Sequence, residues 1–479
     1  MGDIRFGSDG WRGRIAEEYT FDSVRRVAQA VADYFREDTG KASQGVVIGY
    51  DRRFASEHFA AAAAEVLAGN DIHVFLVHTA TPTPAISFSV LSKRAAGAII
   101  ITASHNPPTD NGFKVRDHRG VAVAPGDLKR IEARVPESLG SVTRVPLKAA
   151  TSNGLVETFD PAPAYTEYVR KRLDLEPVKQ AGLTVAYDAM WGVGAGWLAC
   201  LLDGGSTTVH TIRGDRNPIF PGMRRPEPIP PNIDALLEEV IEVGADVGIA
   251  NDGDADRMGL ADEKGHFVTQ LQVGGLLALY LLQIRNQRGS IVKTLSSTVM
   301  LHILGQQFGL DVFETGIGPK YVGQKVIETN AMLGATESGG FIFRGLPERD
   351  GILAALYILD MMVQTEKRPS QLLDWLYDTV GAPYYYDRID TDFLPEQRDA
   401  IERRILNANP AAISGLAVTG LDTTNDVKFN LADGGWLLFH FSGTEPIIRI
   451  YCETTHKDKV KALLEAGMRL AGLEPERGG

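Results

Sequence analysis

Three aspartates alternate with small residues in residues 251–257 (NDGDADR), directly after the apolar run 247–250. Carboxylates that converge in a poorly solvated loop repel one another unless a cation neutralises them. Oxygen ligands favour a hard divalent ion, and coordination positions left for phosphate or water favour Mg²⁺. The pattern therefore predicts a magnesium site at Asp252, Asp254 and Asp256, with a solvated acidic loop as the alternative.

An EF-hand is a competing interpretation of the same aspartates, with Glu263 as its last ligand. Arg257 stands where that loop requires glycine, and the flanking residues predict strands where an EF-hand has helices. The EF-hand interpretation is therefore rejected.

A serine and a histidine follow another apolar run, 98–101, in residues 102–107 (TASHNP). The run predicts a buried strand, and Pro107 and Pro108 end regular structure after it. Ser104 is then expected on a loop at the carboxyl edge of a sheet, where open α/β sheets bind ligands. His105 could position a phosphoryl oxygen, although a plain polar turn remains an alternative.

Two further loops carry groups that suit a sugar phosphate. Residues 337–340 (ESGG), after the glycine-rich 314–320, place a carboxylate and a hydroxyl on compliant backbone, which can hydrogen-bond to sugar hydroxyls. Residues 441–449 (FSGTEPIIR), between the apolar runs 436–439 and 447–451, combine hydroxyls, backbone amides and a guanidinium that suit a phosphate. A simple turn is the alternative for each.

A near-match to a dinucleotide-binding fingerprint occurs at residues 192–197 (GVGAGW). Trp197 stands where the third glycine belongs, and no well-placed acidic partner supports the match. These glycines are therefore interpreted as packing residues.

The elements that must position these loops alternate in type along the chain, which predicts βαβ units. Strands are expected at 46–50, 72–77, 98–101, 183–188, 209–212, 247–250 and 290–293, and helices at 56–69, near 196, and at 234–243, 270–285, 299–308 and 351–364. The proline-rich segment 217–232 predicts a loop, because proline removes backbone donors and clashes with a preceding helical turn. Three α/β units in series indicate a repeated architecture without a repeated sequence.

Composition excludes several classes of protein. A chain of 479 residues can bury several cores, and its net charge of −12 disfavours a nucleic-acid partner. Cys200 and Cys452 are too few for a disulfide framework, which fits a reducing compartment. No apolar stretch is long enough for a membrane span, and Asp3 and Arg5 stand where a signal peptide would be apolar. We therefore expect a cytoplasmic protein that binds neither membrane nor nucleic acid.

Taken together, these loops resemble those of the α-D-phosphohexomutase superfamily (phosphoglucomutase/phosphomannomutase type), and the resemblance covers nearly the whole chain. The matching segments are 6–13 (FGSDGWRG), the Ser104 loop, 111–114 (NGFK), 251–257, 337–340 and 442–449.

The resemblance implies an α/β fold with a heart-shaped, four-domain architecture. Three similar α/β domains and a smaller C-terminal α+β domain would surround a central cleft, and each would contribute one loop to it. The expected ranges are 1–153 with the phosphoserine loop, 154–260 with the metal-binding loop, 261–378 with the sugar-binding loop and 379–479 with the phosphate-binding loop.

The resemblance also implies the site. Ser104 would carry a phosphoryl group in the resting enzyme, and Mg²⁺ would bind to that group and to Asp252, Asp254 and Asp256. The residues expected around the phosphoryl group are Arg12, His105, Lys114 (also the candidate general base) and Arg257; those expected at the sugar are Lys320, Glu337 and Ser338; those expected at the second phosphate are His440, Ser442, Gly443, Thr444 and Arg449.

The implied activity is interconversion of hexose 1-phosphate and hexose 6-phosphate, with a hexose 1,6-bisphosphate as intermediate and activator. The ESGG loop resembles that of glucose-type members, so glucose is favoured and mannose is possible. Hexose phosphates are the expected ligands, and the protein is expected to be a monomer or a homodimer.

One residue departs from the pattern of this superfamily. His440 stands close to Ser442, where relatives commonly carry an arginine, and a neutral histidine would hold phosphate less firmly. A synthase that releases the bisphosphate is therefore an alternative function. A non-catalytic sugar-phosphate-binding protein is an alternative of another class, which the intact Ser104 and the three aspartates disfavour.

Overall fold

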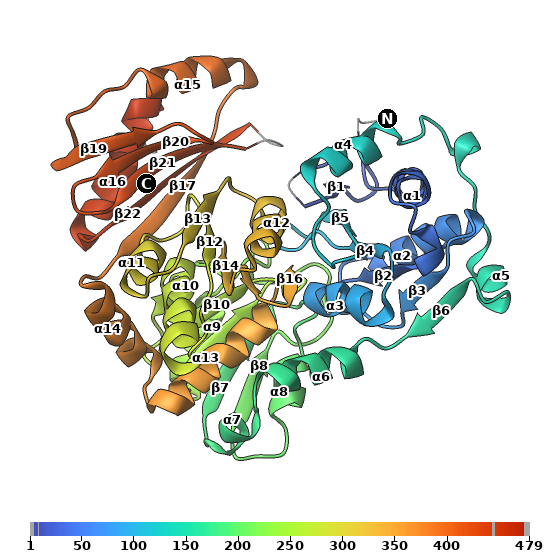
Figure 1. Cartoon of the computed structure of the whole chain (residues 1–479), viewed down its shortest axis with the longest axis horizontal. Helices are drawn as coiled ribbons and strands as arrows, with labels where there is room; N and C mark the ends of the chain where they lie inside the picture. Colours follow the sequence, from blue (N-terminus) through green and yellow to red (C-terminus); the bar gives the residue numbers. More distant parts are fainter. Residues whose placement is uncertain (1–3, 8, 443–445, 474–479) are drawn as a thin grey trace.

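The structure, a computed structural model, describes residues 4–7, 9–442 and 446–473. Four sheets, each with its own helices, form a heart-shaped outline (Figure 1). The first unit (β1–β6) and the C-terminal unit (β17–β22) flank the notch of the heart, and the second (β7–β11) and third (β12–β16) units lie below and between them. The expected fold class is confirmed.

The first unit is a six-stranded sheet in the order β1-β5-β4-β2-β3-β6. Its strands are β1 (Trp11–Arg14), β2 (Val46–Tyr50), β3 (Val74–Val77), β4 (Gly97–Ile101), β5 (Asp110–Arg116) and β6 (Val156–Phe159). Its α-helices are α1 (Phe21–Asp33), α2 (Ser56–Gly69), α3 (Thr83–Lys93), α4 (Pro125–Ala133) and α5 (Leu147–Ser152).

Both faces of this sheet are covered, which explains why β2 is apolar along its length. Val46 and Ile48 pack in a cluster with residues of α1 and α2, whereas Val47 packs in a separate cluster with residues of α3. Alternate side chains of a strand point to opposite faces, so a central parallel strand buried on both sides needs a continuous apolar run.

The second and third units have five-stranded sheets, in the orders β11-β10-β9-β7-β8 and β13-β12-β14-β15-β16. The strands of the second unit are β7 (Thr184–Asp188), β8 (Thr208–Ile212), β9 (Val247–Asn251), β10 (Met258–Ala261) and β11 (Phe267–Val268). Its helices are α6 (Ala162–Arg172), α7 (Glu176–Gln180), α8 (Trp197–Leu202) and α9 (Asp234–Glu242). The strands of the third unit are β12 (Ile291–Thr294), β13 (Val312–Thr315), β14 (Leu333–Ala335), β15 (Phe341–Phe343) and β16 (Leu346–Arg349). Its α-helices are α10 (Gln270–Leu279), α11 (Met300–Gln307), α12 (Pro319–Thr329), α13 (Gly351–Thr365) and α14 (Pro369–Val380).

The three α/β units repeat one topology. In each, a central strand (β2, β7 or β12) lies between its two parallel neighbours, and a fourth strand (β5, β10 or β15) pairs antiparallel to the outer one. The loop that enters this antiparallel strand is the Ser104 loop in the first unit, the aspartate-rich loop in the second and the ESGG loop in the third. The predicted repeat of architecture is confirmed, and it puts the three candidate loops at equivalent positions.

The C-terminal unit is an antiparallel sheet in the order β17-β22-β21-β20-β19-β18. Its strands are β17 (Tyr385–Asp392), β18 (Ala412–Ile413), β19 (Leu416–Asp422), β20 (Val427–Leu431), β21 (Trp436–Phe441) and β22 (Ile447–Thr454). One face packs against α15 (Arg398–Leu406) and α16 (Val460–Ala471). On the other face Trp436, Leu438 and Tyr451 pack with Leu271 and Leu295 of the third unit.

The sheets divide the chain at places that differ from the expected domain ranges. β6 pairs with β3 of the first sheet although its residues lie in the range 154–260, and β11 pairs with β10 of the second sheet although its residues lie in the range 261–378. Both are edge strands that follow a turn. The sequence of such a strand does not identify the strand with which it pairs. The sheet in which a strand pairs does not define where a domain begins or ends. The four expected domain ranges therefore stay predictions.

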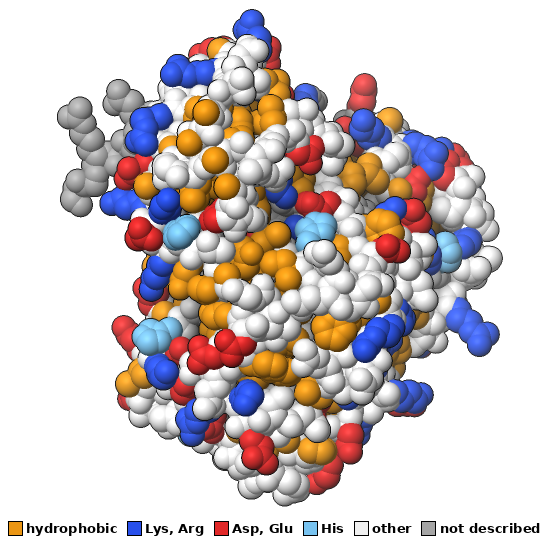
Figure 2. Space-filling view, turned by 60° about the vertical axis from the view of Figure 1, so that its left-hand side comes forward, with side chains coloured by type: hydrophobic (Ala, Val, Ile, Leu, Met, Phe, Trp, Pro, Cys, Tyr) orange, Lys and Arg blue, Asp and Glu red, His pale blue; other side chains and the backbone are white. Residues whose placement is uncertain are grey.

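The surface carries charges of both signs. Acidic and basic side chains are interspersed on the face seen in Figure 2, without a tract of one sign. Within the described part of the chain, the helices are too short or too polar for any of them to cross a membrane.

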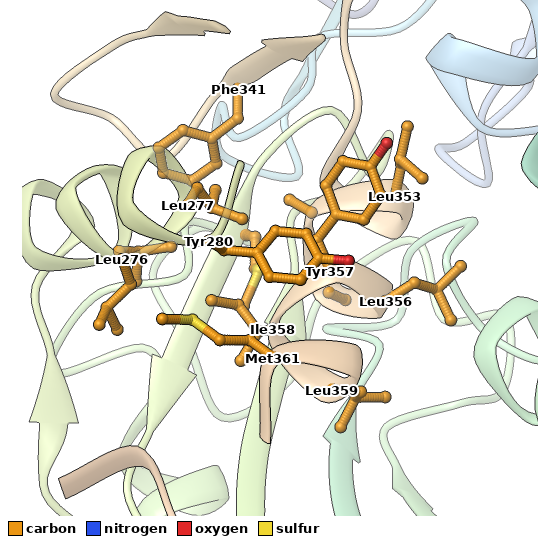
Figure 3. Packing of buried hydrophobic residues seen from close by; sticks show 14 of the residues in the cluster. Leu276, Leu277, Tyr280, Phe341, Leu353, Leu356, Tyr357, Ile358, Leu359 and Met361 are labelled. Carbon is orange, nitrogen blue, oxygen red and sulfur yellow. The ribbon is translucent and has the colours of Figure 1, made fainter. Parts of the chain in front are cut away.

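The second and third units share one hydrophobic core. Tyr280 and Tyr357 lie with their ring centroids 5.3 Å apart, between Leu277 and Phe341 on one side and the rest of α13 on the other (Figure 3). Helix α13, which follows the third sheet, also contacts α7, α8, β9 and β10 of the second unit. The two units therefore form one packed body, and this body fixes the aspartate-rich loop and the ESGG loop relative to each other.

Candidate active site

The three equivalent loops meet at the ends of their sheets. The Ser104 hydroxyl donates a hydrogen bond of 2.7 Å to Oδ2 of Asp252, which joins the first unit to the second. The backbone N–H of Met258 donates to the carbonyl oxygen of Gly339 at 2.9 Å, which joins the second unit to the third. The topological repeat therefore converges on one site.

Ser104 is held in a strained and fully buried position. Its φ of 52° lies in the left-handed region, and its N–H donates to the Thr102 hydroxyl at 2.8 Å. The buried guanidinium of Arg53 donates to the carbonyl oxygens of Ser104 and Asn106, both at 2.6 Å. A left-handed conformation in a non-glycine residue persists only where its surroundings impose it, and here Arg53 and Thr102 do so.

Glycines allow the two loops to approach. A Cβ at Gly253 would lie 2.5 Å from the carbonyl oxygen of Ser104, and a Cβ at Gly192 would lie 2.8 Å from the carbonyl oxygen of Gly253. Because these neighbours are backbone atoms, a larger side chain would force the loops apart. Gly192 thus has the packing role that its sequence context predicts.

The three aspartates form a buried cluster. Asp252, Asp254 and Asp256 each offer a carboxylate oxygen within 4.8 Å of the others. Nζ of Lys114 lies 2.7 Å from Oδ2 of Asp254 and 3.0 Å from Oδ2 of Asp256, whereas Oδ1 of each of these two residues is buried without a hydrogen-bond partner among the described residues. Two orphaned carboxylate oxygens beside a third carboxylate are a donor set that suits a divalent cation.

The electrostatics of the cluster agree with this arrangement. Burial, and then the nearby charges of Asp256 and Asp254, raise the pKa of Asp252 well above its usual range. Burial alone would lower the pKa of Lys114, but Asp254, Asp256 and Asp9 outweigh it and raise that pKa above its usual range. Lys114 is therefore a cation that partly neutralises the aspartates.

The other residues predicted around the phosphoryl group also lie here. Nδ1 of His105 is 3.3 Å from the Ser104 hydroxyl, and burial, followed by the charges of Arg257 and Arg12, lowers the pKa of His105 well below its usual value. The Arg12 guanidinium donates to the side chain of Asn106 in the Ser104 loop, and the backbone N–H of Arg257 donates to Oδ1 of Asp252 at 3.0 Å. Burial and the nearby arginines therefore disfavour the protonated form of His105.

The residues predicted at the sugar lie on the third unit. Oε2 of Glu337, which is buried, accepts from the Thr294 hydroxyl at 3.0 Å, and the Ser338 hydroxyl lies 3.2 Å from that of Thr336. Lys320 stands in the first turn of α12, where burial, and then the charge of Lys129 in the first unit, lower its pKa. The charges of Lys129 and Asp9 both act on Lys320, so this lysine lies near the first unit.

The predicted phosphate loop joins β21 to β22, and Gly443 and Thr444 lie outside the described residues. His440 and Arg449 are directly paired across these strands, so their side chains share the face of the sheet that looks toward the third unit. Nδ1 of His440 lies 2.9 Å from Asp426, and the carbonyl oxygen of Ser442 accepts from Arg398 at 3.2 Å. His440 thus faces the same side as Arg449.

A cavity of about 310 Å³ adjoins this loop. It lies between the 316–321 segment of the third unit and the C-terminal sheet, and His440, Asp426 and Arg398 line it. The space beside His440 is therefore large enough for a sugar or a phosphate group.

Comparisons with known proteins agree with this geometry. Residues 3–139, 163–265 and 270–380 match the phosphoglucomutase/phosphomannomutase alpha/beta/alpha domains I, II and III, respectively. The chain belongs to this family. It is therefore an enzyme of the phosphotransferase isomerase type.

Curated relatives of the family match along nearly their whole length. A phosphoglucomutase/phosphomannomutase of Thermococcus kodakarensis is 31% identical over 98% of both chains. A phosphoglucosamine mutase of Desulfovibrio desulfuricans is 30% identical, over 97% of this chain and 98% of its own. The crystal structure of a candidate phosphomannomutase from Thermus thermophilus is 34% identical, superposes with a TM-score of 0.85 and covers 98% of this chain and 99% of its own.

Several charged residues that lie at this site were not predicted from the sequence. Asp9 lies 3.0 Å from Nζ of Lys114, 2.9 Å from Arg116 and 2.9 Å from Arg349, and Arg349 also contacts Asp256 at 2.5 Å. Asp9 is part of the quoted N-terminal motif, and Arg349 lies in a short charged run between apolar segments. These two features were the only local signs that the residues belong to the site. Their pairing could not be predicted, because the partners are far apart in the sequence.

Proposed function

We propose that this enzyme is a phosphohexomutase that interconverts hexose 1-phosphate and hexose 6-phosphate through phosphorylated Ser104 and a hexose 1,6-bisphosphate. The observation that carries the proposal is the hydrogen bond of 2.7 Å from the Ser104 hydroxyl to Asp252, in a cluster of three buried aspartates. A nucleophile at a cation site suits phosphoryl transfer, which needs charge neutralisation and alignment.

Asp252, Asp254 and Asp256 would hold a magnesium ion, since the orphaned Oδ1 atoms of Asp254 and Asp256 fit a hard cation. When bound, Mg²⁺ would withdraw charge from the oxygens of the phosphoryl group. Lys114 supplies a further positive charge, and its raised pKa favours that role over the role of general base.

In the transfer step, a hydroxyl oxygen of the sugar monophosphate forms a bond to the phosphorus on Ser104. The bond from phosphorus to the serine oxygen breaks, and the hydroxyl proton ends on the Ser104 oxygen. The bisphosphate then turns by half a rotation and returns its other phosphate to Ser104 by the reverse reaction. Arg12, Arg257 and neutral His105 are proposed to hold the phosphoryl oxygens during both steps.

The remaining predicted residues are proposed to hold the rest of the substrate. Glu337, Ser338 and Lys320 would bind the sugar hydroxyls, and the carboxylate of Glu337 suits bidentate hydrogen bonding to a vicinal pair. His440, Ser442, Gly443, Thr444 and Arg449 would hold the phosphate that does not react.

Glucose is the proposed sugar, with mannose as a second substrate. The names of the relatives include phosphoglucosamine mutase as well as phosphoglucomutase/phosphomannomutase, so glucosamine 6-phosphate is the competing substrate to test. A bisphosphate such as glucose 1,6-bisphosphate is the proposed activator.

Phosphorus NMR of the enzyme with Mg²⁺ and each hexose 1-phosphate in turn tests the proposal. We expect conversion of glucose 1-phosphate to glucose 6-phosphate, faster when a trace of glucose 1,6-bisphosphate is added. Conversion of glucosamine phosphate alone would keep the mechanism and replace the sugar. No conversion of any hexose phosphate, with Ser104 remaining unphosphorylated, would contradict the proposal.

A further inference from the structure

An unassigned cluster of arginines surrounds Glu227 in the proline-rich segment 217–232. Glu227 is only 3% exposed. Its Oε2 lies 2.6 Å from Arg225, and its Oε1 lies 3.4 Å from Arg257 and 3.5 Å from Arg388. One buried carboxylate of the second unit is thus shared by guanidinium groups from its own segment, from the aspartate-rich loop and from strand β17 of the C-terminal unit.

The cluster continues across the C-terminal sheet. Asp390 lies 3.4 Å from Nε of Arg388 and 3.6 Å from Nε of Arg449, and Asp390 and Arg449 are directly paired between β17 and β22. The backbone N–H of Arg257 donates to Asp252, which also accepts from the Ser104 hydroxyl. The arginines therefore form a continuous series from the Ser104 site to the proposed phosphate loop.

This series carries more positive than negative charge. Four guanidinium groups (Arg225, Arg257, Arg388 and Arg449) contact two carboxylates, Glu227 and Asp390, so cationic groups outnumber anionic ones around these two carboxylates. Asp256 lies 3.9 Å from Nε of Arg257, but it is already paired with Lys114 and Arg349.

One donor in the series is also unused. Arg257 is 8% exposed, and its Nε has no hydrogen-bond partner within the described chain. A buried guanidinium donor without an acceptor is costly, and a phosphate dianion would supply that acceptor and a negative charge beside the arginines.

We propose that Arg225, Arg257 and Arg388 form a transit site that holds one phosphate of the bisphosphate while the sugar turns between its two binding modes. This inference rests on the proposed function. During the turn each phosphate leaves one end of the site before it reaches the other. A third anion site between the two ends would keep the intermediate attached.

Two features make this site suited to retention. Arg388 belongs to the C-terminal unit, whereas Arg225 and Glu227 belong to the second, so an anion between them links the two units across the site. Arg225 has a side-chain exposure of 33%, so the cluster is open to a ligand on that side. The transit site therefore favours a mutase over a synthase that releases the bisphosphate.

The test measures how the intermediate partitions. The enzyme is labelled on Ser104 with ³²P from labelled glucose 1,6-bisphosphate, and unlabelled glucose 1-phosphate is added for one turnover. The label is then counted in free bisphosphate and in glucose 6-phosphate. This ratio does not depend on the rate of the first transfer or on the active fraction of the sample.

In the wild type we expect most label in glucose 6-phosphate. In Arg388→Gln and in Arg225→Gln we expect the ratio of free bisphosphate to product to rise about tenfold, the usual effect of losing a hydrogen bond to a charged group. Arg403→Gln is the matched control, because Arg403 is an exposed residue of α15 whose side chain donates to the backbone carbonyl oxygen of Asp399, away from Glu227.

Calorimetry in a Ser104→Ala background is a second measurement. Arg388→Gln should weaken binding of glucose 1,6-bisphosphate more than binding of glucose 1-phosphate. If the wild type transfers label but both variants partition as it does, the transit site is wrong and the proposed function stands. A folded Arg225→Gln protein that transfers no label also overturns the transit site, because its arginine would then act in the first transfer. A wild type that transfers no label to any hexose phosphate refutes both.

Discussion

In each of the three aspartates at the Ser104 site, the two carboxylate oxygens have different surroundings. Asp254 and Asp256 turn Oδ2 toward Lys114 and leave Oδ1 without a partner among the described residues, while Asp252 uses its oxygens for Ser104 and for the N–H of Arg257. Lys114 thus neutralises the aspartates without filling the positions that a divalent ion needs.

Replacement of Ser104 tests the nucleophile. Ser104→Ala should abolish phosphorylation of the resting protein and lower turnover by about a thousandfold or more, because the covalent step is lost. Mass spectrometry of the intact protein checks this, with the exposed Ser138→Ala as control. A phosphoryl group that remains on the Ser104→Ala protein would place the nucleophile elsewhere.

Removal of one aspartate charge tests the cation site. Asp254→Asn should weaken Mn²⁺ binding, measured by electron paramagnetic resonance, at least about tenfold and should abolish turnover. Chelation of the wild type should do the same reversibly. Asp234→Asn, in the exposed first turn of α9, is the control. Full turnover in excess chelator would refute the metal assignment.

His440 tests the departure from the family pattern. It shares its face with Arg449, so His440→Arg should bring a permanent charge and a planar donor group to the phosphate and lower KM for glucose 1-phosphate about threefold to tenfold. His456→Arg, at an exposed position, is the control. An unchanged KM would mean that the side chain stays on Asp426, and the departure would then carry no functional meaning.

At the scale of elements, the site depends on one connection used three times. Each candidate loop enters the antiparallel strand that follows three parallel ones, so three sheets with the same strand order present their loops in the same way. The loops then need only small residues to meet. Gly253 is such a residue, because its Cα faces the Ser104 backbone.

Gly253→Ala should therefore damage the site without unfolding the chain. The added Cβ would lie 2.5 Å from the Ser104 carbonyl oxygen, so the hydrogen bond from Ser104 to Asp252 should break. We expect kcat to fall at least about tenfold, since a small misplacement of reacting groups is enough for that loss. Gly126→Ala, whose Cβ would meet no atom of the described chain within 4 Å, should leave kcat unchanged. Equal kcat values for the two variants would contradict the close approach of the loops.

The elements were largely predictable from sequence, and the contacts between them were not. The apolar run before residues 251–257 predicts a buried strand, and the structure has that strand, β9, at Val247–Asn251. The prediction succeeds because β9 is covered on both faces and so needs apolar residues along its length. The partnership of Asp9 and Arg349 could not be predicted, because these residues are 340 positions apart and nothing local marks either as the other's partner. Likewise β6 is an edge strand whose sequence does not identify β3 as its neighbour.

At the scale of the whole molecule, cores and sheets divide the chain differently. There are four sheets in the described chain, but α13 packs on both the second and the third unit, so these two share one hydrophobic core. The C-terminal unit and the first unit each have cores of their own. The second and third units should therefore unfold together.

Leu353→Ala tests this joint unfolding. Leu353 is fully buried in the shared core, and its truncation should cost about 2–5 kcal/mol. Trp197 in the second unit and Trp375 in the third both pack against this core, so single-tryptophan variants should report the same shift in denaturant midpoint. Leu437→Ala, in the C-terminal core, should shift the unfolding transition reported by Trp436 more than the transitions reported by Trp197 and Trp375. Separate shifts for Trp197 and Trp375 after Leu353→Ala would show two cores.

The shared core has a consequence for the newly made chain on the ribosome. The two clusters of the first unit are built from residues between 4 and 159, so that unit can close as soon as this segment has emerged. The second unit cannot do so, because α13, which contacts its strands β9 and β10, is made about a hundred residues after them. During that interval the apolar surface that α13 will cover stays exposed, and a chaperone that binds nascent chains should therefore favour this stage of synthesis.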